Sequence, residues 1–163
     1  MSAMIGHHAQ AIVMAEMAPT HGASPSLRTL AARIINAQLD EIALMQQWLR
    51  ERKQPVPEAR PGATRMTHGG VEHEMRMPGM LTDAQLKQLD EARSAEFDRL
   101  FLQFMIQHHQ GAVTMVKELF SSQGAALDDT VFKITSDINV DQMTEIARMQ
   151  KMLVALLTEK PAQ

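Results

Sequence analysis

Two pairs of adjacent histidines are the residues of this chain whose type and spacing best suit chemistry. One pair lies in MIGHHAQAIVM (residues 4–14) and the other in MIQHHQGAVTM (residues 105–115), at an offset of 101 residues. Imidazole nitrogens bind many transition metals, and thioether sulfurs select soft monovalent copper. The repeated element therefore predicts metal ligation by its histidines and methionines. Its candidate ligands are Met4, His7, His8, Met14, Met105, His108, His109 and Met115.

A second repeat supplies two carboxylates. Residues 38–49 (QLDEIALMQQWL) match residues 142–153 (QMTEIARMQKML) at an offset of 104, which aligns Glu41 with Glu145. Both glutamates fall on the apolar stripe of a predicted helix, where an unpaired charge would be costly. We therefore expect histidines as their partners. Glu41 and Glu145 are candidate metal ligands, or acceptors that fix the tautomer of an imidazole ligand.

The segment between the repeats carries a third set of candidate ligands. MTHGGVEHEMRMPGM is crowded with methionine and histidine, and thioethers stay unprotonated at biological pH. The segment is either a site for monovalent copper or a loop whose methionines anchor it to the surface. Met45, Met143, Met149 and Met152 lie at helical spacing instead and are expected in the core. The candidate ligands of the segment are Met66, His68, His73, Met75, Met77 and Met80.

The repeated histidines and glutamates admit three interpretations. They form a buried hydrogen-bond network that fixes how two structural units pair, with methionines filling the core. Alternatively, they ligate a transition metal for binding alone. In the third interpretation, the same residues hold a catalytic metal.

The elements that position these residues are predicted to be helices. Apolar residues recur at spacings of three and four, and no alternating strand pattern is present. In the first half, a helix is expected to end near Ala18. Ser24 caps a second helix, with Pro25 at its first position, which runs to about Lys53. Both histidine pairs lie on the core-facing stripe of their helices and should point inward.

The second half repeats this arrangement. A helix is expected to end near Phe120, and Asp128 or Asp129 caps another that reaches about Thr158. Thr82 and Gln85 predict a capping box for a short helix before this half begins. We therefore expect one all-α domain, a four-helix bundle of two repeated hairpins with pseudo-twofold symmetry. Its parts are residues 1–54 (first hairpin), 55–81 (Met/His-rich linker, read as a loop), 82–93 (short helix) and 94–160 (second hairpin) within 1–163.

Composition excludes several classes of function. Of 163 residues, 45% are hydrophobic and 21% charged, with a net charge of −3, so neither disorder nor a nucleic-acid partner is indicated. The chain has 14 methionines and no cysteine, which removes thiolate chemistry and suits an oxidising compartment. No apolar run is long enough to span a membrane. Met1 aligns with Leu102, inside a helix, so we expect an N-terminus that is processed, truncated or incompletely recorded. The N-terminus has no basic region followed by an apolar one, so a signal for export, if the protein is exported, is not part of this sequence.

On three elements the chain resembles the ferritin-like family called domain of unknown function 305. They are FLQFMIQHHQGAVTM, MPGMLT and the QxxEIxxMxxWL pattern of residues 38–49. The resemblance covers nearly the whole chain in two halves. It implies a ferritin-like four-helix bundle in secreted or periplasmic bacterial proteins, some of them associated with copper binding and tolerance. The family's motif falls on Met4, His7, His8, Met14, Met105, His108, His109 and Met115.

We therefore expect a periplasmic or secreted copper-binding protein, a chaperone or scavenger without turnover, whose partner is the metal ion, Cu⁺ or Cu²⁺. The alternatives are a ferritin-like metal-dependent oxidoreductase and a structural or interaction bundle without metal. The di-iron pattern of the oxidoreductase requires Glu-x-x-His on the same helix and four carboxylates in total, whereas here His7 and His8 lie on one helix, Glu41 lies on another, and methionines fill nearby positions.

Overall fold

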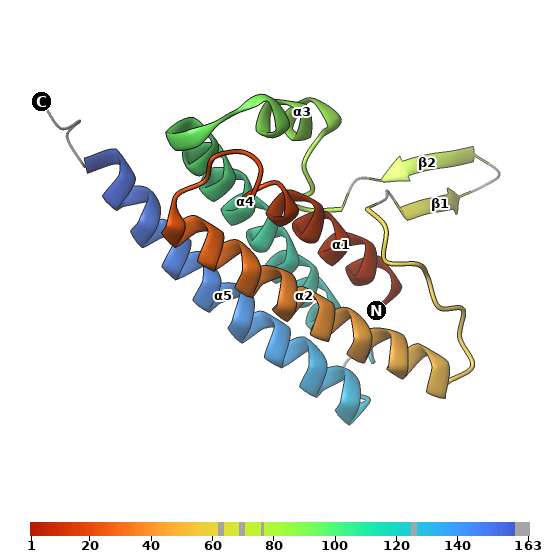
Figure 1. Ribbon diagram of the computed structural model, residues 1–163. Helices are drawn as coiled ribbons and strands as arrows, with labels where there is room; N and C mark the ends of the chain where they lie inside the picture. Colours follow the sequence, from red (N-terminus) through yellow and green to blue (C-terminus); the bar gives the residue numbers. More distant parts are fainter. Residues whose placement is uncertain (62–63, 69–70, 76, 125–126, 159–163) are drawn as a thin grey trace, which may run out of the picture.

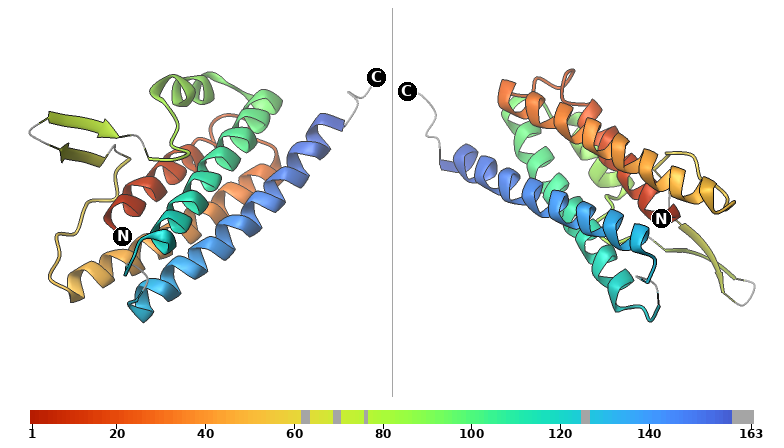
Figure 2. Two further views of the ribbon diagram at one scale, coloured as in Figure 1. Left: turned by 180° about the vertical axis from the view of Figure 1, so that it is seen from behind. Right: turned by 90° about the horizontal axis from the view of Figure 1, so that it is seen from below.

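In the computed structural model of the chain, four long helices pair as two hairpins (Figure 1). The first hairpin is α1 (Ser2–Glu16) with α2 (Pro25–Glu51), and the second is α4 (Ser94–Ser121) with α5 (Asp129–Thr158). Figure 2 shows these helices packed along one another in both views. The expected all-α four-helix bundle is confirmed.

Two smaller elements lie between the hairpins: a β-ribbon and the helix α3 (Asp83–Glu91). Strands β1 (Thr64–His68) and β2 (Val71–Met75) pair antiparallel and project from the bundle (Figure 1). The expectation of a loop throughout residues 55–81 is therefore wrong for these strands. A Gly-Gly dipeptide, a typical hairpin signal, separates the two runs in the sequence. The structure describes residues 1–61, 64–68, 71–75, 77–124 and 127–158, with side chains described outside 62–76.

Side-chain caps start the helices where the sequence predicts. The hydroxyl of Ser24 accepts a hydrogen bond from the backbone N–H of Leu27, and Pro25 follows the cap. Thr82 and Gln85 form the complete capping box of α3. Asp128 accepts from the N–H of Val131 at the start of α5. These caps satisfy N–H groups that the helices themselves leave unpaired, so the predicted starts are confirmed.

The core consists of two hydrophobic clusters at different levels of the bundle. One contains Phe97 and Phe101 of α4, and the other contains Ile5 of α1, Ile42 of α2 and Ile138 of α5. Along every long helix, buried polar residues separate the stretches that feed the two clusters. The bundle thus carries a polar layer through its middle.

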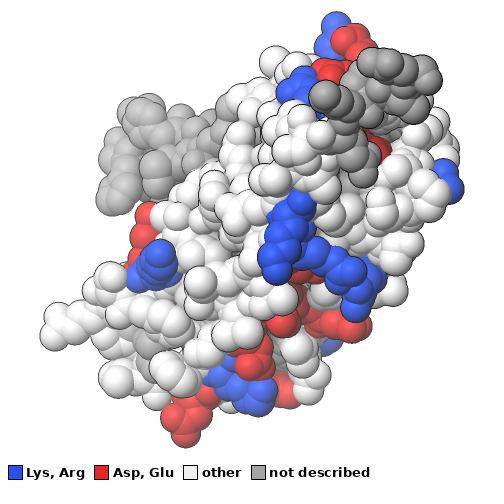
Figure 3. Space-filling model, turned by 90° about the vertical axis from the view of Figure 1, so that its left-hand side faces the viewer, with Lys and Arg blue, Asp and Glu red and all other residues white. Residues whose placement is uncertain are grey.

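The surface gives limited information about partners. No helix within the described ranges is long and apolar enough to cross a membrane. On the face shown in Figure 3, acidic and basic side chains lie next to one another. This mixture differs from the continuous basic surface that is typical of nucleic-acid-binding proteins.

Candidate metal centre

Four buried imidazoles form the centre of the polar layer. His7 and His8 of α1 and His108 and His109 of α4 are each at most 1% exposed, so the expectation that both pairs point inward is confirmed. The rings of His7 and His108 lie closest, with centroids 3.9 Å apart. Within each pair the centroids are 6.3 Å (α1) and 6.1 Å (α4) apart. We call these four residues the histidine layer.

Each hairpin supplies one carboxylate to the second histidine of its pair. In the first hairpin, Glu41 Oε2 lies 2.7 Å from His8 Nε2. In the second, Glu145 Oε2 lies 2.5 Å from His109 Nε2 and accepts its hydrogen bond. The predicted pairing of glutamate with histidine is confirmed in both halves. The contact of His8 with Glu41 lacks hydrogen-bond alignment, so both facing atoms remain without a hydrogen-bond partner among the described residues.

The first histidine of each pair is held by a backbone carbonyl. His7 Nε2 lies 2.9 Å from the carbonyl oxygen of Pro78, and His108 Nε2 lies 3.0 Å from that of His7. A carbonyl oxygen only accepts hydrogen bonds. In both rings, Nε2 therefore carries the hydrogen, and Nδ1 carries a lone pair. His109 likewise carries a hydrogen on Nε2, which it donates to Glu145.

The Nδ1 atoms of the histidine layer have no hydrogen-bond donor facing them within the described structure. Nδ1 of His7, His8, His108 and His109 is buried and, among the described residues, has no hydrogen-bond partner. Leaving a polar atom in this state costs about 1–3 kcal/mol, and most buried polar atoms are paired. An imidazole whose N–H is held by a carbonyl or carboxylate, with its other nitrogen free, has the arrangement of a metal-ligating histidine. The layer is therefore a candidate metal centre.

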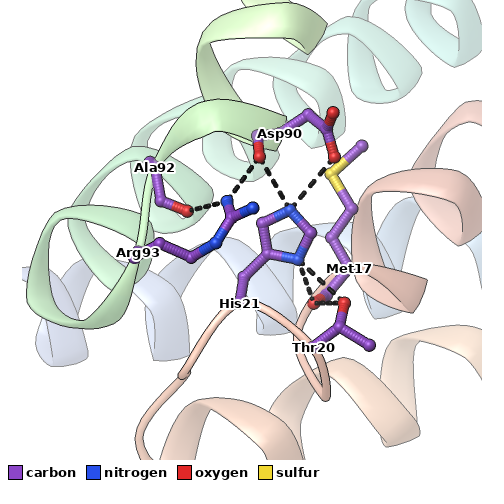
Figure 4. A network of polar contacts seen from close by, with 6 residues as sticks. All are labelled: Met17, Thr20, His21, Asp90, Ala92 and Arg93. Atoms are coloured by element: carbon purple, nitrogen blue, oxygen red, sulfur yellow. Dashed lines mark hydrogen bonds and ion pairs between the residues drawn. The ribbon is translucent and has the colours of Figure 1, made fainter.

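His21, which is also buried, shows the contrasting arrangement (Figure 4). Its Nδ1 lies 2.8 Å from the carbonyl oxygen of Met17 and 2.9 Å from the hydroxyl of Thr20. Its Nε2 lies 2.9 Å from the carbonyl oxygen of Asp90 and contacts the carboxylate of the same residue. Both nitrogens have partners, so His21 ties the α1–α2 loop to the end of α3. Its role is structural.

Burial keeps three imidazoles of the histidine layer, those of His7, His8 and His108, uncharged. Loss of hydration lowers the pKa of His7 to about 3, with the neighbouring His8 as the next cause. Burial lowers the pKa of His8 to about 3 as well, and that of His108 well below its ordinary value. These imidazoles are neutral at pH 7 and can bind a metal without first losing a proton.

Glu41 links the layer to an acidic groove between α2 and α5. It is 8% exposed and lines a cavity of about 440 Å³ together with Asp40, Asp137 and Asp141. Burial, followed by the charge of Glu145, raises the pKa of Glu41 to about 7. Burial also raises the pKa of Asp141, with Glu41 as the next cause. The groove would attract cations toward the carboxylate that contacts His8.

The methionines of the repeated motif take different positions. Met14 and Met105 are fully buried, Met4 is 7% exposed, and Met115 is half-buried. Among the residues that the structure describes, no group of three or more His, Asp or Glu is arranged to hold a metal ion. Any ion in the layer would therefore depend on the free nitrogen atoms, and not on a preformed cage of nitrogen and oxygen ligands.

The four methionines expected in the core differ in their exposure to solvent. Met45 and Met149 are fully buried and Met152 is partly buried. Met143 is 55% exposed, so its expected place in the core is wrong. It follows Gln142, which lies on the buried face of α5, and the helical turn carries position 143 off that face.

The linker methionines and histidines do not all join the histidine layer. Met77 and Met80 are each 8% exposed and pack against the bundle. The remaining four lie in the ribbon, where the backbone register pairs Met66 with His73. The side chains of these four lie outside the described part of the structure. They are Met66, His68, His73 and Met75.

Sequence reasoning missed the segment that supports His7. Residues 77–81, here called the docking segment, cross α1 and α4 at the histidine layer. Gln10 forms two hydrogen bonds with the backbone of Leu81, and Pro78 provides the acceptor for His7. A Cβ added to Gly111 would lie 2.0 Å from the Pro78 carbonyl oxygen, so only glycine fits there. The available sequence signal was the alignment of Gln10 with Gly111, one of several positions at which the two repeats differ.

Gln38 was also missed. It lies one turn before Glu41 on α2, is 1% exposed, and has no partner for either amide atom within the described residues. Its place in the second repeat is taken by Gln142, which is 2% exposed. The repeat therefore extends the polar layer with a buried amide from each hairpin.

Comparison with solved structures gives close matches of fold. A DUF305 fragment from Deinococcus radiodurans has 28% identity and a TM-score of 0.76, covering 94% of this chain and 92% of that one. CopM in its Cu(II)-bound form has 32% identity and a TM-score of 0.69, covering 93% and 91%. CopM in its Cu(I)-bound form has 31% identity and a TM-score of 0.66, covering 93% of each chain. No curated protein matches the chain significantly.

The family model named Domain of unknown function (DUF305) matches residues 1–153. The match includes both hairpins up to the last turns of α5, and with them every residue of the histidine layer and both glutamates. By this match over nearly its whole length, the chain belongs to the DUF305 family.

Proposed function

We propose that this protein binds copper in the histidine layer and acts as a carrier or scavenger of the ion. The observation that carries the proposal is the set of four buried imidazoles whose Nδ1 atoms have no hydrogen-bond partner among the described residues. Burial keeps His7, His8 and His108 uncharged. Glu145 and the carbonyl oxygens of Pro78 and His7 hold the opposite nitrogens. This arrangement fixes both the orientation and the tautomer of a metal ligand.

A purely structural network explains only half of these contacts. The Nε2 atoms of His7, His108 and His109 tie the hairpins and the docking segment together. In a network that only stabilises the fold, we would expect the Nδ1 atoms to have hydrogen-bond partners too, as Nδ1 of His21 has. Binding of an ion would satisfy them.

The choice of copper rests on the ligand types and on similarity. Neutral imidazoles suit copper, and the chain is rich in methionine, whose thioether is the ligand type that soft monovalent copper prefers. Structures of the similar protein CopM are described in Cu(I)- and Cu(II)-bound forms. We propose the same ion for this chain, with Glu41 and Glu145 as ligands or as acceptors behind the imidazoles.

We propose a periplasmic or secreted location. The chain uses methionine where a cytosolic copper protein could use cysteine, and thioethers persist where free thiols oxidise. The 14 methionines and the absence of cysteine support this proposal.

Nitrogen NMR of the full chain tests the proposed function directly. The protein is labelled with ¹⁵N-histidine and titrated anaerobically with Cu(I). The Nδ1 signals of His7, His108 and His109 should shift on binding, while their Nε2 signals keep the N–H state. His21 serves as an internal control, since both of its nitrogens already have partners. Unchanged signals from the layer, or shifts only in His21, would overturn the proposal.

A further inference from the structure

The internal repeat relates two sets of three methionines. The offset of 101 residues matches Met4 with Met105 and Met14 with Met115, and the offset of 104 matches Met45 with Met149. Met4, Met45 and Met115, from α1, α2 and α4, form one set, here called the open triad. Its counterpart, here called the sealed triad, is Met105, Met149 and Met14.

The two triads lie on opposite sides of the histidine layer. The sealed triad belongs to the hydrophobic cluster that contains Phe97 and Phe101. In the open triad, Met4 and Met45 belong to the other cluster, and Met115 packs against it. Met4 lies one helical turn before His7, and Met45 lies one turn after Glu41. The open triad is thus the next level of the bundle beyond the layer.

Access to solvent distinguishes the triads. All three sulfur-bearing side chains of the sealed triad belong to residues that are 0% exposed. The open triad lines a cavity of about 270 Å³, whose walls also include Glu118, Ser122 and Thr135. Met45 lines this cavity although it is 0% exposed, and Met115 is half-buried. Met1 reaches the same cavity, but its counterpart Leu102 carries no sulfur.

We propose that the open triad binds a soft monovalent ion, Cu(I) or Ag(I), at a second site beside the histidine layer. Three neutral thioethers on one cavity are the ligand type that soft monovalent ions prefer, and they need not lose a proton to bind. The carboxylate of Glu118 in the cavity wall offsets the positive charge of the ion. The sealed triad has the same chemistry without access and serves packing. This second site rests on the proposed function, because both sites would bind the same ion.

Methyl NMR of the full chain provides the test. The protein is labelled at the methionine methyl groups and titrated with Ag(I), which does not change oxidation state. Single Met→Leu variants assign the signals. The methyl signals of Met4, Met45 and Met115 should shift, and those of the sealed triad should not. Equal shifts in both triads, or none in the open triad, would overturn the proposal.

A matched pair of triple variants measures the stoichiometry. Leucine keeps the apolar bulk and removes the sulfur. Met4→Leu/Met45→Leu/Met115→Leu should lose one equivalent of bound Ag(I), and Met14→Leu/Met105→Leu/Met149→Leu should lose none. Circular dichroism checks that both variants fold, and the methyl shifts of the native chain decide the matter if either does not.

The same samples separate this site from the histidine layer. In the open-triad variant, the histidine nitrogen signals should still respond to the ion. If the histidine nitrogen signals of the native chain do not change while the methyl signals of the open triad shift, copper binding in the histidine layer is contradicted and the open-triad site is supported. If the nitrogens shift and the methyls do not, the triad site fails alone.

Discussion

His108 donates a hydrogen bond from Nε2 to the backbone carbonyl oxygen of His7, its own counterpart in the repeat, at 3.0 Å. The reciprocal bond is absent from the described hydrogen bonds of His7, whose Nε2 reaches the carbonyl oxygen of Pro78 instead, at 2.9 Å. The docking segment thus replaces one half of a symmetric pair. It makes the two sides of the histidine layer different, although the residues that form them are the same.

The first prediction concerns the close packing of the docking segment on α4. Gly111→Ala should destabilise the protein, because the new methyl group would meet the Pro78 carbonyl oxygen at 2.0 Å and force the segment away. We expect a loss on the order of 1–3 kcal/mol, as for other overpacked sites. Urea unfolding measures the change.

Gly6→Ala is the matched control for this substitution. Gly6 lies in α1 and aligns with Gln107 in the repeat, so the equivalent position accepts a long side chain. Alanine is a better helix former than glycine by about 1 kcal/mol, so this variant should be neutral or more stable. A Gly111→Ala variant as stable as Gly6→Ala would show that the docking segment yields without cost.

The second prediction concerns the carboxylate behind His109. Glu145→Gln should weaken copper binding by about 10- to 100-fold, which is typical when a group that orients a metal-ligating histidine is changed. The amide lacks the charge that strengthens the hydrogen bond from Nε2, although it keeps the shape of the carboxylate. Competition with a chromogenic Cu(I) chelator measures the affinity.

Asp90→Asn makes the same chemical change at His21. Because His21 has partners for both nitrogens, this variant should bind copper as tightly as the native chain. An equal loss of affinity in both variants would indicate a general effect of lowering the negative charge, and the specific role of Glu145 would have to be abandoned.

The third prediction concerns the metal-free protein in acid. Burial lowers the folded-state pKa of His7 and His8 from 6.5 to about 3, so only the unfolded chain gains these two protons between those values. Burial also lowers the pKa of His108 well below 6.5, which acts in the same direction. Their contribution to stability is therefore present above pH 6.5 and is lost as the pH falls. Glu41, with its pKa raised from 4.5 to about 7, acts in the opposite direction between those values.

Three histidines outweigh one glutamate, so stability should fall between pH 6.5 and 4.5. Each net proton taken up on unfolding changes the free energy of unfolding by about 1.4 kcal/mol per pH unit. The urea midpoint of the metal-free chain at pH 7, 6 and 5 provides the measurement. A midpoint that is constant or rises toward pH 5 would mean that the layer is hydrated or charged in the folded protein.

The histidine–glutamate contacts within each hairpin could be predicted from the sequence. The contact between the docking segment and the bundle could not. His8 with Glu41 and His109 with Glu145 follow from two repeated motifs on the apolar stripes of neighbouring helices. The bond of His7 to Pro78 spans 71 residues and depends on how the docking segment returns to the bundle. The spacing of residue types in the sequence cannot predict this contact, because the docking segment contributes a backbone oxygen, which every residue has.

The methionines illustrate the same limit. Helical spacing placed Met45 and Met149 correctly in the core, but it could not separate a buried position that is sealed from one that borders a cavity. The repeat makes these two residues equivalent in sequence. Only the packing of the surrounding helices makes Met45 part of an accessible cavity and leaves Met149 enclosed.

The last prediction concerns the ribbon between the hairpins. Met66→Leu/Met75→Leu in the full chain should lower the amount of bound Cu(I), because both methionines lie in a segment rich in soft ligands and Met66 is the register partner of His73. Met77 and Met80 are buried against the bundle, so Met77→Leu/Met80→Leu should change the amount less.

Acid alone cannot separate this ribbon site from the histidine layer. An exposed histidine site would weaken between pH 7 and 5, but His7 and His8, with pKa values of about 3, stay neutral at both. The variants must therefore distinguish the sites. In the ribbon variant, the histidine nitrogens and the open triad should respond to the ion as in the native chain, with only the total copper reduced. If the ribbon variant binds as much copper as the native chain, its methionines serve packing or solubility, and copper binding is confined to the bundle.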